Sequence, residues 1–311
     1  MVDLAAAAGA DAVKFQTFTA DAIATETAGL AQYQSGVLGA GGTQRELLSS
    51  VELTREQHEV LAGHAKRRGI QFLSTAFDIA SLDLLQALGV PAFKVPSGEI
   101  TNLPYLRHLS RLGKPIYLSS GMSTLQEVAA ALEVLESGGL RRDSVTVLHC
   151  TSCYPTRMED VNLLAMSTLR HALNVRVGYS DHTLGPEVAV AAVALGAEVI
   201  EKHFTLDRSL PGPDHQASLD GPELHDFIRS IRHIEAALGD GVKRPQLSEI
   251  HTQSVARKSI VAAVPIAAGA KFTEANLTTK RPGTGLSPML WDSVVGSEAA
   301  RAYGADELIA P

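Results

Sequence analysis

Several kinds of residue are scarce in this sequence, and each shortage excludes a class of protein. Two cysteines among 311 residues cannot form the disulfide framework of a small secreted scaffold. Lysine and arginine number 27 against 34 aspartates and glutamates, so the net charge is −7. Without an excess of cations the chain has little to neutralise a phosphate backbone, and we expect no nucleic-acid partner.

Long hydrophobic runs and targeting signals are missing as well. The most apolar stretch, Val188 to Ile200, has 13 residues and includes Glu198, whereas a membrane-spanning helix needs about 20. The N-terminus, Met1 to Leu4, lacks the basic start of a secretory signal. With 45% hydrophobic and 20% charged residues, the composition predicts a globular protein with one large domain or one large and one small. We expect a cytoplasmic protein with no membrane span.

The two cysteines, Cys150 and Cys153, form a single Cys-x-x-Cys motif. A structural zinc site needs four ligands, and no second Cys-x-x-Cys or Cys-x-x-His accompanies this one. A thioredoxin-like motif opens a helix, whereas this pair closes an apolar strand, Ser144 to His149. We therefore interpret the pair as two reduced cysteines at a strand end.

A repeated pattern organises the first 205 residues: an apolar run of four to six residues, a loop, and a stretch with helical spacing. Thr54 with Gln57 three residues later marks one helix start, and Ser123 or Thr124 marks another. Alternating strands and helices imply a parallel sheet, either doubly wound or closed as a (β/α)8 barrel. The seven predicted strands are Ala12–Gln16, Ile70–Thr75, Ala92–Pro96, Pro115–Ser119, Val145–Cys150, Val175–Ser180 and Val199–Phe204.

Polar residues at the strand ends decide between these two architectures. Barrel enzymes assemble their sites from the carboxyl ends of many strands, whereas an open sheet concentrates its ligand groups at one switch point. Because almost every strand here ends in such residues, we expect an α/β TIM-type barrel over residues 1–240. The strand-end residues are Lys14, Gln16, Ser74, Thr75, Lys94, Ser97, Glu99, Ser119, Thr151, Tyr154, Ser180, His182 and His203.

The predicted barrel lacks its first strand. Met1 falls inside a predicted helix, Val2 to Ala8, that runs directly into the strand beginning at Ala12. The neighbouring strands would then expose unpaired edges in the barrel wall. We expect either an upstream segment that is absent from this sequence or a partner that closes the gap.

The alternation of strands and helices stops after a long helix, Pro222 to Leu238. We interpret residues 241–256 as a linker. The tail, residues 257–311, is predicted to be a small, mainly β domain, because Lys258 to Val264 alternates as a strand and Gly, Pro and Thr punctuate the residues after it.

Two histidines, His182 and His203, each sit at the end of one of two consecutive predicted strands, so we expect their imidazoles to converge at the barrel mouth about 5 Å apart. That separation suits a shared divalent ion. Substrate or water oxygens would have to complete the shell, since two histidines alone make a weak site. A pair of hydrogen-bonded barrel histidines without a metal explains the spacing equally well.

Lys14 and Lys94 end apolar strands, where a buried ammonium is costly unless it meets an anion. A lone lysine in such a position more often reaches to the rim. Two of them among hydroxyls at equivalent strand ends favour a phosphorylated or carboxylated substrate. Glu99 is a candidate general acid or base, although a glutamate beside a Ser-Gly turn is more often a structural cap. The hydroxyls are those of Thr75, Ser97, Ser119 and Ser180.

Six motifs in order resemble those of the sialic acid synthases, the N-acetylneuraminate synthase family. The likeness covers the whole chain, and the tail, with Arg281-Pro-Gly-Thr-Gly285, resembles the antifreeze-like SAF domain that ends those enzymes. It implies a TIM-type barrel followed by a small SAF domain. The motifs are Phe93-Lys-Val-Pro-Ser-Gly-Glu99, Leu118-Ser-Ser-Gly-Met122, Leu148-His-Cys-Thr-Ser-Cys-Tyr-Pro155, Glu159-Asp-Val-Asn-Leu163, Tyr179-Ser-Asp-His-Thr-Leu184 and Pro211-Gly-Pro-Asp-His215.

The resemblance implies condensation of phosphoenolpyruvate with the open-chain aldehyde of an N-acetylated hexosamine, giving a nine-carbon 2-keto acid and phosphate. By similarity, His182 and His203 hold a divalent ion, Mn²⁺ or Mg²⁺, as a Lewis acid for the aldehyde oxygen. The residues matched to catalysis are Glu99, His182, His203 and Asp214. Those matched to phosphoenolpyruvate are Lys14, Lys94, Thr75, Ser97, Ser119, Ser152 and Ser180, and those matched to the sugar are Glu99, Gln16, Tyr154 and Asp214.

Arg281 lies outside the barrel, in the predicted SAF domain. In the resembled family this loop reaches over the active site of the neighbouring subunit and contacts the N-acyl group, which implies a homodimer with a composite site. Without the resemblance, Arg281 is interpreted as a surface arginine in a turn.

The N-terminus departs from the family pattern. The family's first strand ends in Ala-Glu-hydrophobic-Gly and leads to an Asn-His-x-Gly loop, and no such stretch occurs here. A displaced start codon is the leading hypothesis, which intact-protein mass spectrometry of native material tests. If the shortening is real, we expect poor folding and little synthase turnover, because a strand and an active-site carboxylate are both missing.

Three functions are compatible with the sequence. The first is a sialic acid synthase acting on N-acetylmannosamine. The second keeps the reaction but takes the di-N-acetylated precursor of legionaminic or pseudaminic acid, and the segment Pro211 to Ser218 favours sialic or legionaminic chemistry. The third is a non-catalytic sugar-binding homologue, against which the intact ring of polar strand-end residues argues.

Overall fold

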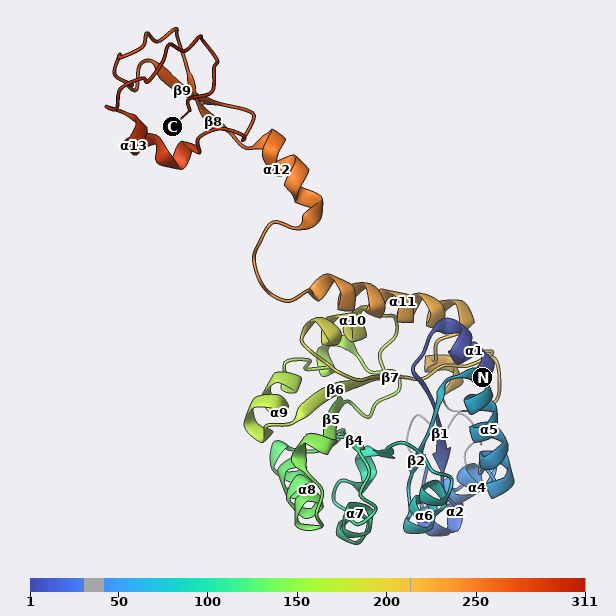
Figure 1. The fold of residues 1–311 in the computed structure, drawn as a ribbon. Coiled ribbons are helices and arrows are strands. Elements are labelled where there is room, and N and C mark those ends of the chain that lie inside the picture. Colours follow the sequence, from blue (N-terminus) through green and yellow to red (C-terminus); the bar gives the residue numbers. More distant parts are fainter. Residues whose placement is uncertain (31–41, 213, 311) are drawn as a thin grey trace. The chain divides into compact units, whose positions relative to one another are not determined.

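The computed structural model of the protein describes residues 1–30, 42–212 and 214–310. The chain divides into two compact units, Met1–Gly239 and Asp240–Pro311 (Figure 1). The first unit is built on seven parallel strands, each paired with the next in chain order. These strands are β1 (Ala12–Thr17), β2 (Gln71–Ala76), β3 (Phe93–Val95), β4 (Ile116–Ser119), β5 (Val145–Cys150), β6 (Arg176–Asp181) and β7 (Ile200–Lys202).

The sheet curls into a half-barrel with its helices on the outer face (Figure 1). In the part of the chain that the structure describes, β1 and β7 form the two edges of this sheet. The predicted α/β barrel architecture with seven of its strands is confirmed, and every predicted strand overlaps an observed one. β3 and β7 are shorter than predicted, because Pro96 has no N–H to continue the ladder and the His203 carbonyl accepts from Leu219 N at 3.0 Å.

Helices connect the strands of the first unit and begin where the sequence predicts. Thr54 and Thr124 each form a capping box, with Gln57 and Glu127 respectively. No helix in the described ranges is long and apolar enough to cross a membrane. The helices are α1 (Val2–Ala8), α2 (Ala20–Ile23), α4 (Gln44–Ser49), α5 (Arg55–Arg68), α6 (Ile79–Ala87), α7 (Leu103–Ser110), α8 (Leu125–Ser137), α9 (Ala165–Leu173), α10 (Glu187–Ala194) and α11 (Gly221–Leu238), with short 3-10 turns at Ser97–Glu99, Arg142–Ser144, Met158–Asp160 and His215–Ala217.

Apolar strand residues pack the helices against the sheet and fix the strand ends. Val13, Val95, Leu118 and Val177 come from four different strands and are at most 1% exposed. A second cluster, which includes Ala189 of α10 and Phe227 of α11, packs near β7. Dense apolar packing leaves few alternative positions for the backbone, so the side chains at the strand ends start from well-defined places.

The second unit has its own small core. β8 (Ser259–Ala262) and β9 (Leu277–Lys280) pair antiparallel, and α13 (Trp291–Val294) follows a 3-10 turn at Pro288–Leu290. Ile260, Phe272, Leu277 and Tyr303 form part of its buried cluster. The segment 241–256, expected as a linker, contains a 3-10 turn at Leu247–Glu249 and α12 (Ile250–Ala256), neither of which has a buried residue.

Candidate active site

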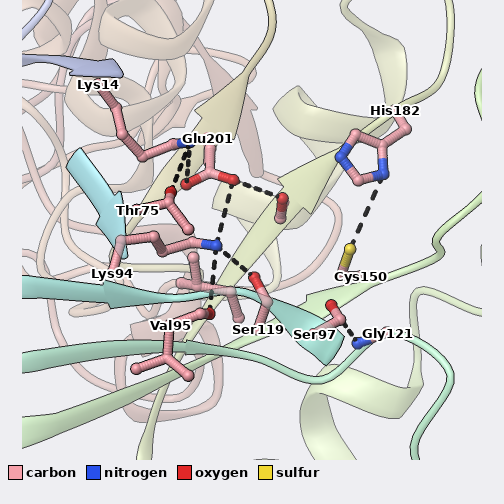
Figure 2. Close-up of polar contacts among 12 residues, drawn as sticks. Lys14, Thr75, Lys94, Val95, Ser97, Ser119, Gly121, Cys150, His182 and Glu201 are labelled. Atoms are coloured by element: carbon pink, nitrogen blue, oxygen red, sulfur yellow. Dashed lines mark hydrogen bonds and ion pairs between the residues drawn. The ribbon is translucent and has the colours of Figure 1, made fainter. Parts of the chain in front are cut away.

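Polar side chains gather at the carboxyl ends of the strands, which lie at one rim because the strands are parallel. Five of the six residues at the centre of this cluster are predicted from the sequence, and the sixth, Glu201, is not. Figure 2 shows Lys14, Lys94 and Glu201 pointing toward one another. The six are Lys14 of β1, Thr75 of β2, Lys94 of β3, Ser119 of β4, Ser180 of β6 and Glu201 of β7.

Glu201 joins the two lysines. Its Oε2 lies 3.9 Å from Lys14 Nζ and its Oε1 lies 3.5 Å from Lys94 Nζ. Ser180 Oγ donates a hydrogen bond to the same Oε1 at 2.9 Å. Since Lys14 belongs to β1 and Glu201 to β7, the carboxylate brings side chains of the two edge strands together.

Each lysine also donates to a hydroxyl of the next strand. Lys14 Nζ lies 3.0 Å from Thr75 Oγ1, and Lys94 Nζ lies 2.8 Å from Ser119 Oγ. The Lys94 side chain is only 5% exposed. Both ammonium groups are thus oriented by neutral oxygens as well as by the carboxylate (Figure 2), and an incoming anion meets donors that are already in place.

The charges of this cluster do not cancel. Burial alone would raise the pKa of Glu201, but Lys14, Lys94 and the Ser180 hydrogen bond outweigh it and bring the pKa to about 2. Burial lowers the pKa of Lys14, and Lys94 lowers it further, while Glu201 opposes both. One carboxylate facing two ammonium groups leaves one positive charge at the rim, so the cluster favours an anionic ligand.

A second group of donors lies beside this cluster, at Ser97, Gly121 and Ser152. Gly121 N donates to Ser97 Oγ at 3.0 Å (Figure 2). A Cβ at position 121 would lie 2.3 Å from Ser152 Oγ and 2.7 Å from Ser97 Oγ, closer than real side chains approach. Glycine is therefore required for the two predicted serines to meet at this point.

The two histidines come together as predicted. The ring centres of His182 and His203 are 5.5 Å apart, and the Tyr154 ring centre lies 4.1 Å from the first and 5.8 Å from the second. Burial lowers the pKa of His182, although its hydrogen bond to Thr151 opposes this effect. Burial also lowers the pKa of His203, to about 3, and Lys14 and His182 add to the shift. Both imidazoles are therefore neutral at physiological pH, and each has a nitrogen lone pair.

The tautomer of His182 is set by its surroundings. Its Nδ1 lies 2.8 Å from the Thr151 carbonyl oxygen. A carbonyl only accepts, so Nδ1 holds the proton and Nε2 holds the lone pair, the arrangement seen in metal-binding histidines. Cys150 Sγ lies 3.8 Å from the same nitrogen (Figure 2). Within the described residues, no third histidine, cysteine or carboxylate joins the pair to complete a protein metal cluster.

Two predicted carboxylates have pKa values suited to proton transfer. Glu99 is half-buried just after β3, and burial raises its pKa although Asn102 Nδ2 donates to it at 2.5 Å. Burial also raises the pKa of Asp214, while His215 and Lys14 oppose the shift. A carboxyl group with a raised pKa holds a proton nearer neutral pH and can act as a general acid.

The two remaining predicted residues, Gln16 and Arg281, are exposed. Gln16 is exposed on β1, two residues after Lys14, and its Cα pairs with Thr75 in the sheet register. Arg281 belongs to the second unit, where it is exposed and its Nε donates to the Ala256 carbonyl at 3.0 Å. Its predicted contact with a neighbouring subunit stays a prediction.

Sequence reasoning missed Glu201, although a signal for it exists. Side chains alternate along a strand, so a residue two positions before His203 lies on the same face as the predicted ligand. The two lysines at strand ends also required an anion, and Glu201 is the acidic residue on that face of β7.

The fold and this site define a class of protein. Lysine ammonium groups, hydroxyls, neutral imidazoles and carboxyl groups lie together at the carboxyl ends of the strands of a curled parallel sheet. Barrel enzymes bind their substrates at this position. The class is a barrel-type enzyme that acts on a small anionic substrate.

Comparisons with known proteins identify the family. A sequence model described as the NeuB family matches residues 1–243, and one for the SAF domain matches residues 257–311. The chain is 48% identical to the N,N'-diacetyllegionaminic acid synthase of Campylobacter jejuni, covering 99% of this chain and 92% of that protein. It is 46% identical to the protein of the same name from Legionella pneumophila, covering 96% and 84%.

A solved structure agrees with these relatives. The crystal structure of N-acetylneuraminic acid synthetase from Leptospira borgpetersenii, in complex with citrate, superposes with a TM-score of 0.70 at 32% identity, covering 81% of this chain and 82% of that one. The chain belongs to the NeuB family of synthases and ends in a SAF domain. The predicted family and its C-terminal domain are confirmed.

Proposed function

We propose that this protein condenses phosphoenolpyruvate with the aldehyde of a di-N-acetylated hexose, forming a nine-carbon 2-keto acid of the legionaminic type and releasing phosphate. Two relatives named for that product are more similar to this chain than the structure named for N-acetylneuraminic acid. The observation that carries the proposal is the surplus positive charge of Lys14 and Lys94 against the single Glu201 carboxylate.

Phosphoenolpyruvate matches the donors at the rim. Its carboxylate and phosphate each accept several charge-assisted hydrogen bonds, and the site offers two ammonium groups and a group of hydroxyls. Glu201 contacts both ammonium groups, at 3.9 Å from Lys14 and 3.5 Å from Lys94. The residues proposed to bind this substrate are Lys14, Lys94, Thr75, Ser97, Ser119, Ser152 and Ser180.

A divalent cation, Mn²⁺ or Mg²⁺, fits the two histidines. Both imidazoles are neutral and 5.5 Å apart between ring centres, and the Thr151 carbonyl fixes the tautomer of His182. Such an ion would act as a Lewis acid for the sugar aldehyde. Because only two protein donors are present in the described part of this cluster, the other ligands would be substrate or water oxygens.

The chemistry requires two proton transfers. Carbon three of phosphoenolpyruvate attacks the aldehyde carbon, and the aldehyde oxygen takes a proton to become a hydroxyl. Water captures the oxocarbenium centre at carbon two and loses a proton, after which C–O cleavage releases inorganic phosphate. Glu99 and Asp214, with raised pKa values, are the proposed proton donor and acceptor.

The sugar would lie on the side of the rim formed by Glu99, Gln16, Tyr154 and Asp214. Arg281 of the partner subunit would contact an N-acyl group, so a homodimer in the cytoplasm is part of this proposal. The exposed position of Arg281 leaves its guanidinium accessible for such a contact. Gel filtration with light scattering tests the dimer, and a monomer that turns over at the full rate would contradict it.

Phosphate release with different sugars tests the substrate. We expect turnover with the di-N-acetylated hexose and much less with N-acetylmannosamine, and turnover must fall when a chelator removes the metal. Higher kcat/KM with N-acetylmannosamine would assign the protein to sialic acid synthesis instead. If the protein bound phosphoenolpyruvate and Mn²⁺ but formed no keto acid with any of these sugars, it would be a non-catalytic homologue.

A further inference from the structure

A buried ion pair lies immediately beside the two histidines in the sequence. Asp181 ends β6 and Lys202 ends β7, and the two are direct partners in the sheet register. Lys202 Nζ lies 2.7 Å from Asp181 Oδ2, and the two side chains are 4% and 0% exposed. His182 and His203 are the next residues of the chain.

The pair faces the helices, away from the substrate rim. Side chains alternate along a strand, and Ser180 and Glu201, the preceding residues, meet inside the rim. Lys202 Nζ instead lies 5.9 Å from the ring centre of Phe227 on α11, which packs against α10 and β7 (Figure 1). Asp181 and Lys202 therefore point toward the helices, on the face of β6 and β7 opposite to Ser180 and Glu201.

The remaining contacts of the pair connect the backbone on both sides of His182 to Lys202. Asp181 Oδ1 accepts hydrogen bonds from Thr183 N at 2.9 Å and from Thr183 Oγ1 at 2.7 Å. Lys202 Nζ donates to the carbonyl oxygens of Thr183 and of Gly185, the latter at 3.4 Å. The residues on both sides of His182 are thus tied to the residue that precedes His203.

Stability alone gives little reason for such a pair. Burying two charges costs about as much desolvation free energy as their attraction returns, and apolar replacements of similar volume are often neutral or stabilising. An ion pair with all its donors and acceptors satisfied does fix one geometry, because every alternative leaves a buried charge without a partner. The hydrogen bond from His182 Nδ1 to the Thr151 carbonyl depends on such a fixed backbone.

Resting on the function proposed above, we propose that Asp181 and Lys202 are positioning residues that hold the backbone of both histidines so that their imidazoles share one divalent ion. They act from the opposite face of β6 and β7 and touch neither substrate nor metal. The partners of a ligating residue tune metal affinity strongly, and their loss typically costs about 10- to 100-fold.

The double variant Asp181→Asn with Lys202→Met tests this proposal, because it removes both charges and leaves none unpaired. The matched control is Arg176→Gln with Glu198→Gln, which removes an exposed ion pair between the first residue of β6 and the segment before β7. Three quantities are measured: the thermal midpoint, the affinity for Mn²⁺ alone by EPR titration, and the His182 tautomer by nitrogen-15 NMR, with the signal assigned by His182→Gln.

We expect the double variant to melt within about 4 °C of the wild-type protein. It should bind Mn²⁺ roughly tenfold more weakly and lose the single Nδ1–H tautomer of His182. The control should match the wild-type protein in all three measurements. Unchanged Mn²⁺ affinity together with an unchanged tautomer would make the pair merely structural and overturn the proposal.

Two further outcomes are decisive. If the wild-type protein binds no Mn²⁺, the metal role in the proposed function fails, and the tautomer alone then decides whether the pair positions His182. If the double variant does not fold, Asp181→Glu replaces it, since this change keeps both charges and displaces the carboxylate by one methylene. Wild-type Mn²⁺ affinity and tautomer in Asp181→Glu would overturn the proposal.

Discussion

Two groups of charges lie on opposite faces of the same two strands, β6 and β7, and they differ in balance and exposure. On the inner face, Glu201 meets two lysines, and the side chains of Lys14 and Glu201 remain 22% and 19% exposed. On the outer face, Asp181 meets Lys202 alone, and the two side chains are at most 4% exposed. The inner group has a surplus positive charge that is accessible to water. The outer pair has no net charge and is buried.

This difference in charge balance and exposure suits the inner group to binding substrate and the outer pair to positioning the backbone. A surplus charge that is only partly buried is stabilised further when an anion arrives, so it suits substrate capture. A closed, neutral pair has no free charge to offer a ligand, so it suits a role in holding the backbone. Neighbouring residues of one strand can therefore serve different purposes because alternate side chains face different surroundings.

The largest effect is expected from changing a lysine of the inner face. Lys94→Met leaves Glu201 with one cation and removes the surplus charge, so kcat/KM for phosphoenolpyruvate should fall roughly 1,000-fold. Steady-state phosphate release measures this loss. Lys66→Met, at an exposed position of α5, is the control and should keep full activity. Activity within tenfold of wild type in Lys94→Met would remove the inner face from the binding site.

A smaller effect is expected from crowding the serine hydroxyls. In Gly121→Ala, the new methyl would lie 2.3 Å from Ser152 Oγ and 2.7 Å from Ser97 Oγ, so both hydroxyls must move. We expect the KM for phosphoenolpyruvate to rise about 30-fold with the thermal midpoint little changed. In the control Gly63→Ala, the nearest atom lies 3.6 Å away. An unchanged KM in Gly121→Ala would show that these serines do not contact the substrate.

The reaction rates of the two cysteines with a thiol reagent measure how accessible the inner face is to solvent. Cys153 is exposed, whereas Cys150 is buried beside His182, and burial raises the pKa of its thiol. Iodoacetamide at neutral pH should therefore modify Cys153 at least about tenfold faster than Cys150. Peptide mass spectrometry over a time course measures both rates. Equal rates would mean that the interior of the half-barrel opens readily to solvent.

The smallest effect concerns the pH dependence of stability. Burial and Lys94 lower the pKa of Lys14 in the folded protein although Glu201 opposes them. Between this lowered pKa and the unfolded value of about 10.4, the unfolded chain binds more protons, so this group's contribution to the free energy of unfolding rises with pH. Relative to Lys14→Met, the wild-type protein should therefore gain stability as the pH rises through this window.

Urea unfolding of both proteins at several alkaline pH values measures that difference. Lys66→Met again serves as the control, because its side chain is exposed and its difference from wild type should stay constant with pH. If the difference for Lys14→Met were also constant, Lys14 would titrate as it does in the unfolded chain, and burial and Lys94 would not outweigh Glu201.

Much of the fold and the site can be predicted from local patterns. Seven apolar runs predict seven strands, and the Thr54 and Thr124 caps lie where the sequence places them. The lysines and histidines are predicted as site residues because each lies at the end of an apolar run, and the parallel architecture brings strand ends to one rim. The sequence predicts β3 and β7 to be longer than they are, because the hydrophobic runs continue past the residues where the sheet hydrogen bonds end.

By itself, the sequence determined the order of the elements, the strand-end residues and the likeness to a synthase family, because periodicity and motifs are local properties of the chain. Only the tertiary structure decided which face of the sheet each side chain lies on and which side chains it contacts there. Glu201 is paired with lysines 187 and 107 positions away in the chain, and Asp181 with Lys202 across two adjacent strands. Charge balance is a property of such neighbours, and distance along the chain does not encode it.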